Sequence, residues 1–275
     1  PGGDVKDLPS GSMGRLKRTR RARRADGRRQ KWKSRRQRAA APHCLPPLAM
    51  HTSIGTPPWW ASMGFWAVDA LNGNSWTSTL RMALARSTAD VSLIPETKVY
   101  GEAAISAAKA QGQTEGWTTA FASALLTNEG GLSGGCAVGV RSGYGLTDDE
   151  PSPVRAGLGH RACHAHVAAI ARGGVHFITP YPKDSIGAAG DNVSLLDDLG
   201  ATIASLRGPW VAGGDWNLTP QELLETNWPE LVGGVIVAPS LPTCNQHTYD
   251  YFVVAQELAG AVVGVQVISD IGFTP

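Results

Sequence analysis

The sequence lacks long apolar runs and paired cysteines, and these absences exclude several classes of protein. The 275-residue sequence contains no apolar stretch of 18 or more residues, so it predicts no membrane-spanning helix. The four cysteines, Cys44, Cys136, Cys163 and Cys244, lie far apart without a CxxC pair, which suits neither a zinc ribbon nor a disulfide framework. The tryptophan-rich residues 57–71 lack the layout of a signal peptide. We therefore expect a protein of a reducing, intracellular compartment.

Charge is divided unevenly between the start of the chain and the rest. The formal net charge of +2 combines a net of +12 in residues 1–50, from 15 Lys+Arg and 3 Asp+Glu, with a net of −10 in residues 51–275. Residues 1–38 contain almost no apolar side chains, so we predict a disordered basic arm that charge repulsion keeps extended. Residues 39–58 are punctuated by proline and predict a linker.

The basic arm has two open interpretations. Arginine runs are typical of nucleic-acid-binding or nuclear-import segments. On this interpretation phosphate binding falls to the central arginines of the arm, Arg20, Arg21, Arg23 and Arg24. The alternative is a solvated tail without a role, because such runs are unspecific. The first interpretation predicts DNA or RNA as the partner and a nuclear location, and we expect a monomer with no membrane or protein partner.

Strand-like and helix-like segments alternate over residues 59–275, which we interpret as one domain. Apolar runs predict strands at residues 64–71, 89–96, 117–123, 135–142, 162–170, 174–181, 209–214, 248–255 and 261–269. Helical spacing predicts helices at residues 76–87, 102–111, 192–208 and 220–228. Helices mixed with consecutive strands favour an α/β or α+β sandwich. No internal repeat is present.

Polar residues gather where the predicted strands end. The main members of this group are Asn72, Asn74, Glu96, Lys98, Tyr181, Lys183, Asp184, Asp215, Asn217, Asp250 and Asp270. Loops at strand ends carry ligand groups because the sheet holds them rigid. Carboxylates about 4 Å apart repel by on the order of 4 kcal/mol at an effective dielectric near 20. A divalent cation removes that repulsion, and oxygen ligands favour Mg²⁺ or Mn²⁺.

The stretch "GGDWNLTP", which contains Asp215 and Asn217, shows how each member also has a structural explanation. An Asp or Asn after two glycines is common as a helix cap or a turn former. The functional interpretation therefore rests on the order and spacing of the whole set. Together these residues predict an oxygen-rich metal and phosphate site, of which Asp215 and Asn217 are half.

In the order and spacing of these motifs the sequence resembles the endonuclease/exonuclease/phosphatase family. Its members include apurinic endonucleases and the endonuclease domains of non-LTR retroelements. The motifs of this chain look most similar to those of these two groups. The segments that carry the resemblance are "LNGNSW", "ADVSLIPETK", "GWTTAF", "GGCAVGVRS", "TPYPKDS", "GGDWNLTP" and "YDYFVV". They occur in family order from about residue 63 to residue 275, which is the whole body of the domain.

The resemblance implies a four-layer α/β/β/α sandwich, in which two packed mixed sheets are flanked by helices, and Mg²⁺-dependent hydrolysis of phosphate esters. It assigns the metal to Glu96 with Asn72 and Asp270, and the phosphate to Asn74. It further assigns catalytic roles to four residues. Asp215 would activate the attacking water, Asn217 and Tyr181 would contact the phosphate, and Asp250 would pair with a histidine.

The chain departs from the family pattern at two positions. Ile271 follows Ser269 and Asp270 where a catalytic histidine is expected, or the chain stops at Pro275 one residue before it. In either case we expect the domain to lack its final catalytic segment and to be impaired, since general acid–base groups contribute roughly 10²–10⁴-fold. Pro95 also replaces the usual glutamine before Glu96. Three functions therefore stay open: an endonuclease-like phosphodiesterase, an inactive remnant that binds nucleic acid through its arm, and a small-substrate phosphatase.

The segment "HRACHAH", residues 160–166, holds three of the seven histidines. His164 and His166 would share one face of a strand, and Cys163 would face the other way. A single metal ion could not easily use all of them. We interpret the segment as ordinary packing or a solvated strand face.

Overall fold

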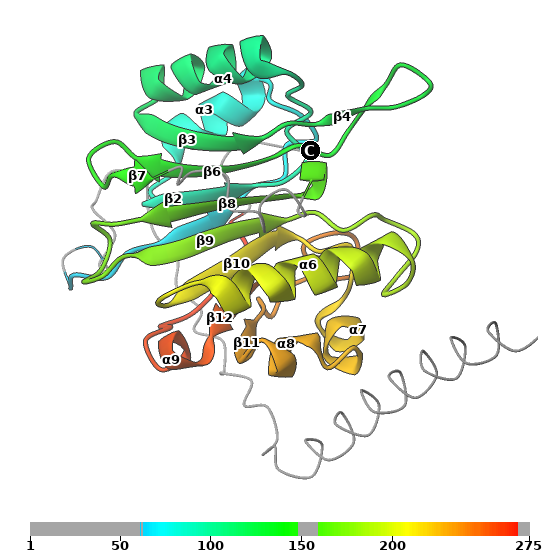
Figure 1. Cartoon of the computed structure of the whole chain (residues 1–275). Helices are drawn as coiled ribbons and strands as arrows, with labels where there is room; N and C mark the ends of the chain where they lie inside the picture. The colour runs from blue at the N-terminus through cyan, green and yellow to red at the C-terminus, as the bar shows by residue number, and fades with distance from the viewer. Residues whose placement is uncertain (1–60, 62, 148–158, 269–275) are drawn as a thin grey trace, which may run out of the picture. The chain divides into compact units, whose positions relative to one another are not determined.

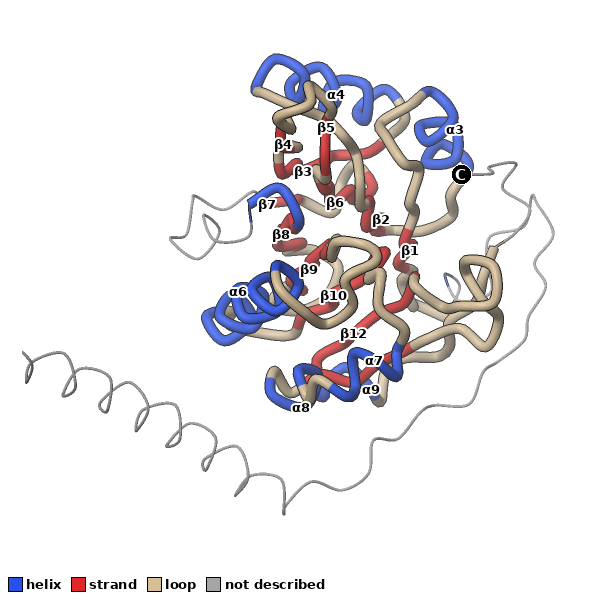
Figure 2. The backbone as a smooth tube through the Cα atoms, turned by 90° about the vertical axis from the view of Figure 1, so that its right-hand side faces the viewer, coloured by secondary structure: helices blue, strands red, loops and turns tan. Residues whose placement is uncertain are grey.

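The computed structural model describes residues 61, 63–147 and 159–268, all of which belong to one compact unit, Cys44–Pro275. The predicted arm (residues 1–38) and linker (residues 39–58) lie outside the described residues, as does Asp270. Within the described part of the chain no helix has the length and apolar content to cross a membrane. Figures 1 and 2 show the arrangement of helices and strands in two perpendicular views.

The first sheet has four strands in the order β1-β2-β6-β3. Its strands are β1 (Val68–Ala70), β2 (Val91–Ile94), β3 (Trp117–Ala122) and β6 (Cys136–Arg141). β1 pairs with β2 in parallel, and the other two pairings are antiparallel. Strand β2 is buried on both of its faces, as its continuous apolar run predicts, because layers of the protein cover it on each side.

The second sheet has six strands in the order β11-β12-β10-β9-β8-β7. Its strands are β7 (Leu146–Thr147), β8 (Ala162–Val167), β9 (Val175–Pro180), β10 (Trp210–Asp215), β11 (Gly234–Val237) and β12 (Asp250–Ala255). β9 and β10 run parallel, and the remaining pairings are antiparallel. A separate two-stranded ribbon joins β4 (Leu125–Leu126) to β5 (Leu132–Ser133), and one turn of 3₁₀ helix (Gly159–Arg161) precedes β8.

The two sheets pack face to face through one apolar layer. Its buried members come from both sheets, among them Leu93, Val138, Phe177, Val211 and Val254. Strand side chains alternate between faces, so each of these strands sends every second residue into the layer. The polar residues that follow the strands are thereby held by a rigid, closely packed core.

Helices cover the outer faces of both sheets, as Figure 1 shows. α3 (Ser78–Arg86) and α4 (Glu102–Thr114) cover the four-stranded sheet, and Leu80 and Leu84 of α3 share a cluster with Trp117. α6 (Asp191–Ser205) and α8 (Trp228–Leu231) cover the six-stranded sheet. The remaining short helices are α7 (Pro220–Glu225) and α9 (Gln256–Ala259). The predicted four-layer sandwich is confirmed.

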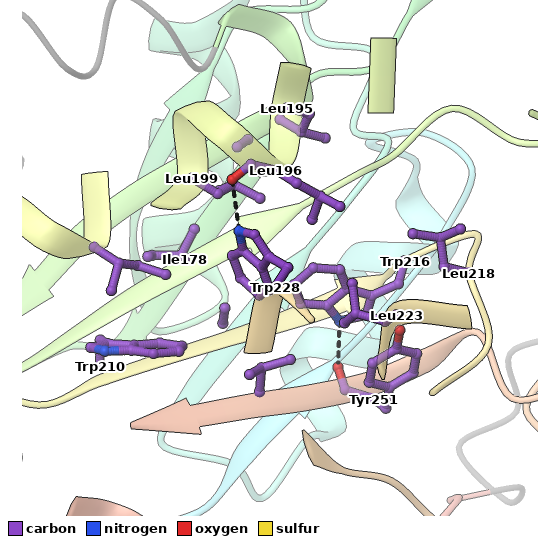
Figure 3. Packing of buried hydrophobic residues seen from close by; sticks show 14 of the residues in the cluster. Ile178, Leu195, Leu196, Leu199, Trp210, Trp216, Leu218, Leu223, Trp228 and Tyr251 are labelled. Atoms are coloured by element: carbon purple, nitrogen blue, oxygen red, sulfur yellow. Dashed lines mark hydrogen bonds between the residues drawn. The ribbon is translucent and has the colours of Figure 1, made fainter. Parts of the chain in front are cut away.

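Aromatic side chains anchor the segment that follows β10. Trp216 is fully buried and donates its indole N–H to the carbonyl of Tyr251 at 3.0 Å, as Figure 3 shows. The Trp216 and Tyr251 rings stack with centroids 5.5 Å apart. Trp228 donates in the same way to the carbonyl of Leu196 in α6 at 2.7 Å. These bonds satisfy buried indole donors and fix the backbone at Trp216.

One predicted strand is absent from the described residues, and several short elements were not predicted. The strand predicted at residues 261–269 is absent over its described part, residues 261–268, where Val262 and Val265 instead pack individually against the apolar layer between the sheets. The strand β11 (Gly234–Val237) was not predicted. Both segments are short valine-rich runs, and periodicity alone does not show which of them finds a neighbouring strand. β11 pairs with β12, and the later run has no such neighbour in the described structure.

Candidate active site

Asp215 and Asp250 lie directly opposite each other on antiparallel strands. Asp215 ends β10, Asp250 begins β12, and the ladder pairs the two residues. Directly opposed residues point to the same face of a sheet, with Cβ atoms about 4.5–5.5 Å apart. Two carboxylates are therefore held close together. Like charges directly opposite each other destabilise a sheet.

At the end of β10, buried apolar residues alternate with partly buried polar residues. Trp216 and Leu218 are fully buried, whereas Asp215 and Asn217 are only partly buried. The backbone N–H of Asn217 donates to Asp215 Oδ1 at 3.0 Å, and the Asn72 amide donates to Asp215 Oδ2 at 2.8 Å. Both oxygens of Asp215 are thus oriented, one of them by a residue 143 positions earlier in the chain.

A second group of polar residues extends from Asn72 to Glu96. The Asn72 side-chain oxygen accepts from the backbone N–H of Asn74 at 2.9 Å, and the Asn74 oxygen accepts from Lys98 Nζ at 2.6 Å. The same ammonium lies 3.3 Å from Glu96 Oε1. A continuous set of contacts therefore links Asp215 to Glu96 through two asparagines and one lysine.

Tyr181 lies at the end of β9 and completes the site. Its hydroxyl donates to the Glu96 carboxylate, and the adjacent Pro182 carbonyl accepts from the Asn217 amide at 2.9 Å. The Arg161 guanidinium donates to the Tyr181 carbonyl at 3.3 Å and lies 5.7 Å from the centroid of its ring. A positive charge is thereby placed beside the acidic cluster.

Burial raises the pKa values of Asp215 and Asp250, and like charges raise that of Asp215 further. Burial is the largest cause for Asp215, followed by the charge of Asp250, and together with a contribution from Glu96 they raise its pKa to about 7. The hydrogen bonds from Asn217 and Asn72 act in the opposite direction. Burial also raises the pKa of Asp250, whereas a hydrogen bond with Thr243 lowers it. Asp215 can therefore exchange a proton near neutral pH, as a general base requires.

Tyr181 keeps its proton in the same environment. Burial raises the pKa of its hydroxyl, and the charge of Glu96, their hydrogen bond and the charge of Asp215 raise it further. The Arg161 guanidinium lowers this pKa to a lesser extent. At neutral pH Tyr181 is a hydrogen-bond donor.

The backbone has a positive φ at four residues of this site, and two of them, Glu96 and Lys98, are strained by it. Asn74, Glu96, Lys98 and Asn217 have φ values of 54°, 54°, 52° and 46°. The left-handed region is tolerated by asparagine but is uncommon for glutamate and lysine. Strain of this kind persists only where the surrounding structure imposes it, and it concentrates at functional sites. Here buried residues flank the strained ones, since Pro95, Thr97 and Val99 alternate with them.

The element of the ligand atoms in this site suits a hard divalent cation. Glu96, Asn72 and Asp215 offer only oxygen, which is the ligand type that Mg²⁺ and Mn²⁺ prefer. Among the described residues no group of three His, Cys, Asp or Glu side chains is placed to enclose a metal ion. Mg²⁺ does not require such a cage, because it commonly keeps several waters and binds through one or two carboxylates. Glu96 with Asn72 is compatible with that mode of binding.

The structure brings together seven of the predicted site residues, and leaves five undescribed. Those that it brings together are Asn72, Asn74, Glu96, Tyr181, Asp215, Asn217 and Asp250. Those that lie outside the described residues are Asp270, Arg20, Arg21, Arg23 and Arg24. The roles of the residues in both groups remain predictions.

Two neighbours of the site were not identified from the sequence. Arg161 lies directly before β8, inside the segment "HRACHAH" but outside the segments that carry the family resemblance, and no pattern distinguishes it from other arginines. Thr243 accepts from the backbone N–H groups of Tyr249 and Asp250, at 2.9 and 3.0 Å, and also contacts the Asp250 carboxylate. Only the folding of the loop before β12 brings that threonine to Asp250.

The chain matches the model of a known protein family. The model of the Endonuclease/Exonuclease/phosphatase family matches residues 25–270 of the chain. The chain belongs to this family. No curated protein sequence matches it.

Solved structures agree with the fold. A beta hairpin deletion mutant of beta toxin from Staphylococcus aureus has a TM-score of 0.50 and 11% identity, and the match covers 75% of this chain and 93% of that one. An endonuclease/exonuclease/phosphatase family protein from Leptotrichia buccalis has a TM-score of 0.45 and 9% identity, with 67% and 85% covered. D. rerio TDP2 in complex with a single-strand DNA product has a TM-score of 0.45 and 14% identity, with 68% and 82% covered. The match to the beta toxin mutant supports the fold alone.

Proposed function

We propose that the chain hydrolyses phosphodiester bonds of DNA or RNA with the help of Mg²⁺ or Mn²⁺. The observation that carries the proposal is the convergence of Glu96, Asp215 and Asp250 with Asn72 and Tyr181 at one place. The charges of Asp250 and Glu96 raise the pKa of Asp215, and such a cluster of carboxylates is electrostatically unfavourable without a cation. The family membership of the chain supports the same chemistry.

Each residue has a proposed part in the reaction. Glu96 and Asn72 would hold the cation, which supplies charge neutralisation at the phosphate when bound. Asp215 accepts a proton from the attacking water, because its pKa of about 7 suits a general base at neutral pH. Tyr181 would turn its hydroxyl from Glu96 to a phosphate oxygen when substrate is bound, and Asn217 would hold the phosphate through the second N–H of its amide.

The basic arm motivates the choice of a polynucleotide substrate. Residues 51–275 carry a net charge of −10 and would repel a polyanion, whereas residues 1–50 carry +12. Basic residues that contact phosphates supply most of the sequence-independent affinity for nucleic acids. The same arm would favour a nuclear location, and a retroelement origin would agree with the style of the motifs.

The direct test is hydrolysis of plasmid DNA, an abasic duplex and single-stranded RNA by the full chain, with Mg²⁺ or with EDTA. We expect Mg²⁺-dependent cleavage of at least one substrate, reduced roughly 10²–10⁴-fold in Asp215→Asn. Asp197→Asn on the exposed side of α6 is the matched control, because it makes the same change far from the motif residues in sequence. Cleavage that EDTA or Asp215→Asn leaves unchanged would contradict the proposal.

A second candidate is an inactive family member that binds nucleic acid through its arm. It is favoured by the contact of Asp250 with the Thr243 hydroxyl, where the family pattern implies a histidine partner. It predicts no hydrolysis of any of the three substrates, and an affinity for nucleic acid that survives Asp215→Ala. The two candidates are therefore distinguished by the same assay.

A further inference from the structure

Three histidines gather on the outer face of the six-stranded sheet, away from the site described above. His164 and His166 lie on β8, and His176 lies opposite His166 on β9. Their neighbours Cys163, Ala165 and Phe177 point into the apolar layer between the sheets, so the three imidazoles point outward. All three are partly exposed.

The hydrogen bonds determine which ring nitrogens face each other. His176 Nε2 lies 3.3 Å from the carbonyl oxygen of Arg207. A carbonyl only accepts, so this nitrogen carries the ring proton and Nδ1 of the neutral ring carries a lone pair. His176 Nδ1 lies 3.0 Å from His164 Nε2, and in the neutral pair it accepts the proton of that nitrogen.

These two nitrogens are as far apart as two imidazole ligands of one metal ion would be. Imidazole nitrogens bind Zn²⁺ at about 2.0–2.1 Å, so two of them at angles of about 90–109° are about 2.9–3.4 Å apart. The observed 3.0 Å falls within this range. Occupation requires the His164 proton to move to its other nitrogen and the two rings, whose planes are now 26° apart, to turn so that both lone pairs point at the ion.

The surroundings of His176 resemble the support that metal-binding histidines usually have. A ligating histidine typically donates its second ring N–H to a carbonyl or carboxylate, which fixes its tautomer, and the Arg207 carbonyl provides this bond. The His166 ring packs against His176 with centroids 4.5 Å apart, while its Nε2 lies 3.2 Å from the Gly173 carbonyl. His166 therefore positions His176.

We propose that His164 and His176 form a second metal site that binds one divalent transition-metal ion of the Cu²⁺, Zn²⁺ and Ni²⁺ class, with water as the remaining ligands. Imidazole nitrogen favours these ions, whereas the oxygen ligands around Glu96 favour Mg²⁺. His176 and Tyr181 are five residues apart along β9, roughly 16 Å in an extended chain. The two sites are thus separate. The three imidazoles do not form a three-ligand site in the described structure, so two nitrogens carry the binding.

The test uses the full chain with His43→Gln and His51→Gln in every sample, because these two residues precede the described part and could bind metal themselves. Ni²⁺ is titrated by calorimetry in excess Mg²⁺, which occupies oxygen ligands. We expect one equivalent of Ni²⁺ to bind, with an affinity that falls at least 10-fold in His164→Gln and in His176→Gln. His247→Gln is the matched control, since His247 is exposed and stacks on Tyr249, and it should leave the affinity unchanged.

Electron paramagnetic resonance of bound Cu²⁺ tests the same proposal without changing either ligand. The expected spectrum shows hyperfine coupling to two imidazole nitrogens. A spectrum without imidazole nitrogen would overturn the proposal. So would undiminished Ni²⁺ affinity in the His164→Gln/His176→Gln double variant.

Discussion

At the scale of single residues, Glu96 joins three features of the site. It contacts Lys98, accepts from Tyr181 and has a left-handed backbone conformation. A charged oxygen ligand contributes strongly to the affinity for a hard cation. We predict that Glu96→Gln raises the Mg²⁺ concentration for half-maximal hydrolysis at least about 10-fold, on the order of the loss seen when metal sites are perturbed. Mg²⁺ titrations of the initial rate measure this.

The matched control for that prediction is Glu257→Gln on the exposed surface of α9. It removes the same charge at a position with no part in the polar cluster. An equal change in the Mg²⁺ requirement of both variants would show that Glu96 acts through general electrostatics. The metal assignment would then be wrong.

Asp215 predicts a dependence of stability on pH. Its pKa is raised from 3.8 in the unfolded chain to about 7 in the folded protein. The protonated form is therefore favoured by folding. The stability it contributes is fully present below about pH 4 and is lost as the pH rises through 7. With allowance for partial exposure, we expect a loss of roughly 1–3 kcal/mol in the free energy of unfolding between pH 4 and 8.

Urea unfolding in EDTA at several pH values measures this loss. The Asp215→Asn variant cannot titrate at this position, so its stability should rise relative to the unchanged protein as the pH increases. Asp197→Asn provides the control for a carboxylate that is exposed. Parallel pH profiles for Asp215→Asn and the unchanged protein would refute the assigned shift.

At the scale of elements, β10 approaches its neighbours so closely that it needs a glycine. A Cβ on Gly213 would lie 2.3 Å from Phe252 Cδ1 and 3.0 Å from Leu93 Cδ1, between the two sheets. Overpacking of this kind typically destabilises a protein by about 1–3 kcal/mol. We predict that Gly213→Ala lowers the free energy of unfolding by this amount and lowers activity, because β10 carries Asp215.

Gly200→Ala is the matched control for Gly213→Ala. Gly200 lies inside α6, and a Cβ there would be 3.5 Å from Trp228 Nε1, which is an ordinary contact. Alanine is a better helix former than glycine by roughly 0.5–1 kcal/mol. We expect this substitution to be neutral or stabilising in denaturant unfolding. A destabilisation as large as that of Gly213→Ala would contradict the packing argument.

At the scale of the whole molecule, the division of charge predicts where nucleic acid binds. Replacement of Arg20, Arg21, Arg23 and Arg24 by alanine removes four positive charges from the arm. If each contacts a phosphate, the slope of log affinity against log salt becomes shallower by up to about 3.6 for duplex DNA. Binding measured by fluorescence anisotropy at several salt concentrations tests this. Asp215→Ala should leave the slope unchanged. An unchanged slope in the arginine variant would show that these arginines do not contact the nucleic acid.

Much of the fold and part of the site could be predicted from the sequence. The alternation of apolar runs identified most strands, and "GGDWNLTP" and "ADVSLIPETK" identified Asp215, Asn217 and Glu96 through their motif context. The strand β11 could not be distinguished from the apolar run at residues 261–268, because their compositions are similar and only pairing separates them. Arg161 and Thr243 were missed, since no local pattern assigns either of them to the site.

The sequence by itself determined the alternation of strands and helices and the residue types of the site, because periodicity and strand-end polarity are local properties. The two-sheet arrangement was expected only from the resemblance to a known family. Only the tertiary structure decided which distant groups meet: Asn72 with Asp215, Asp215 with Asp250, and His164 with His176. Strand pairing and sheet packing set these distances. Contacts between residues far apart in the chain depend on the register of whole strands, which no short stretch of sequence encodes.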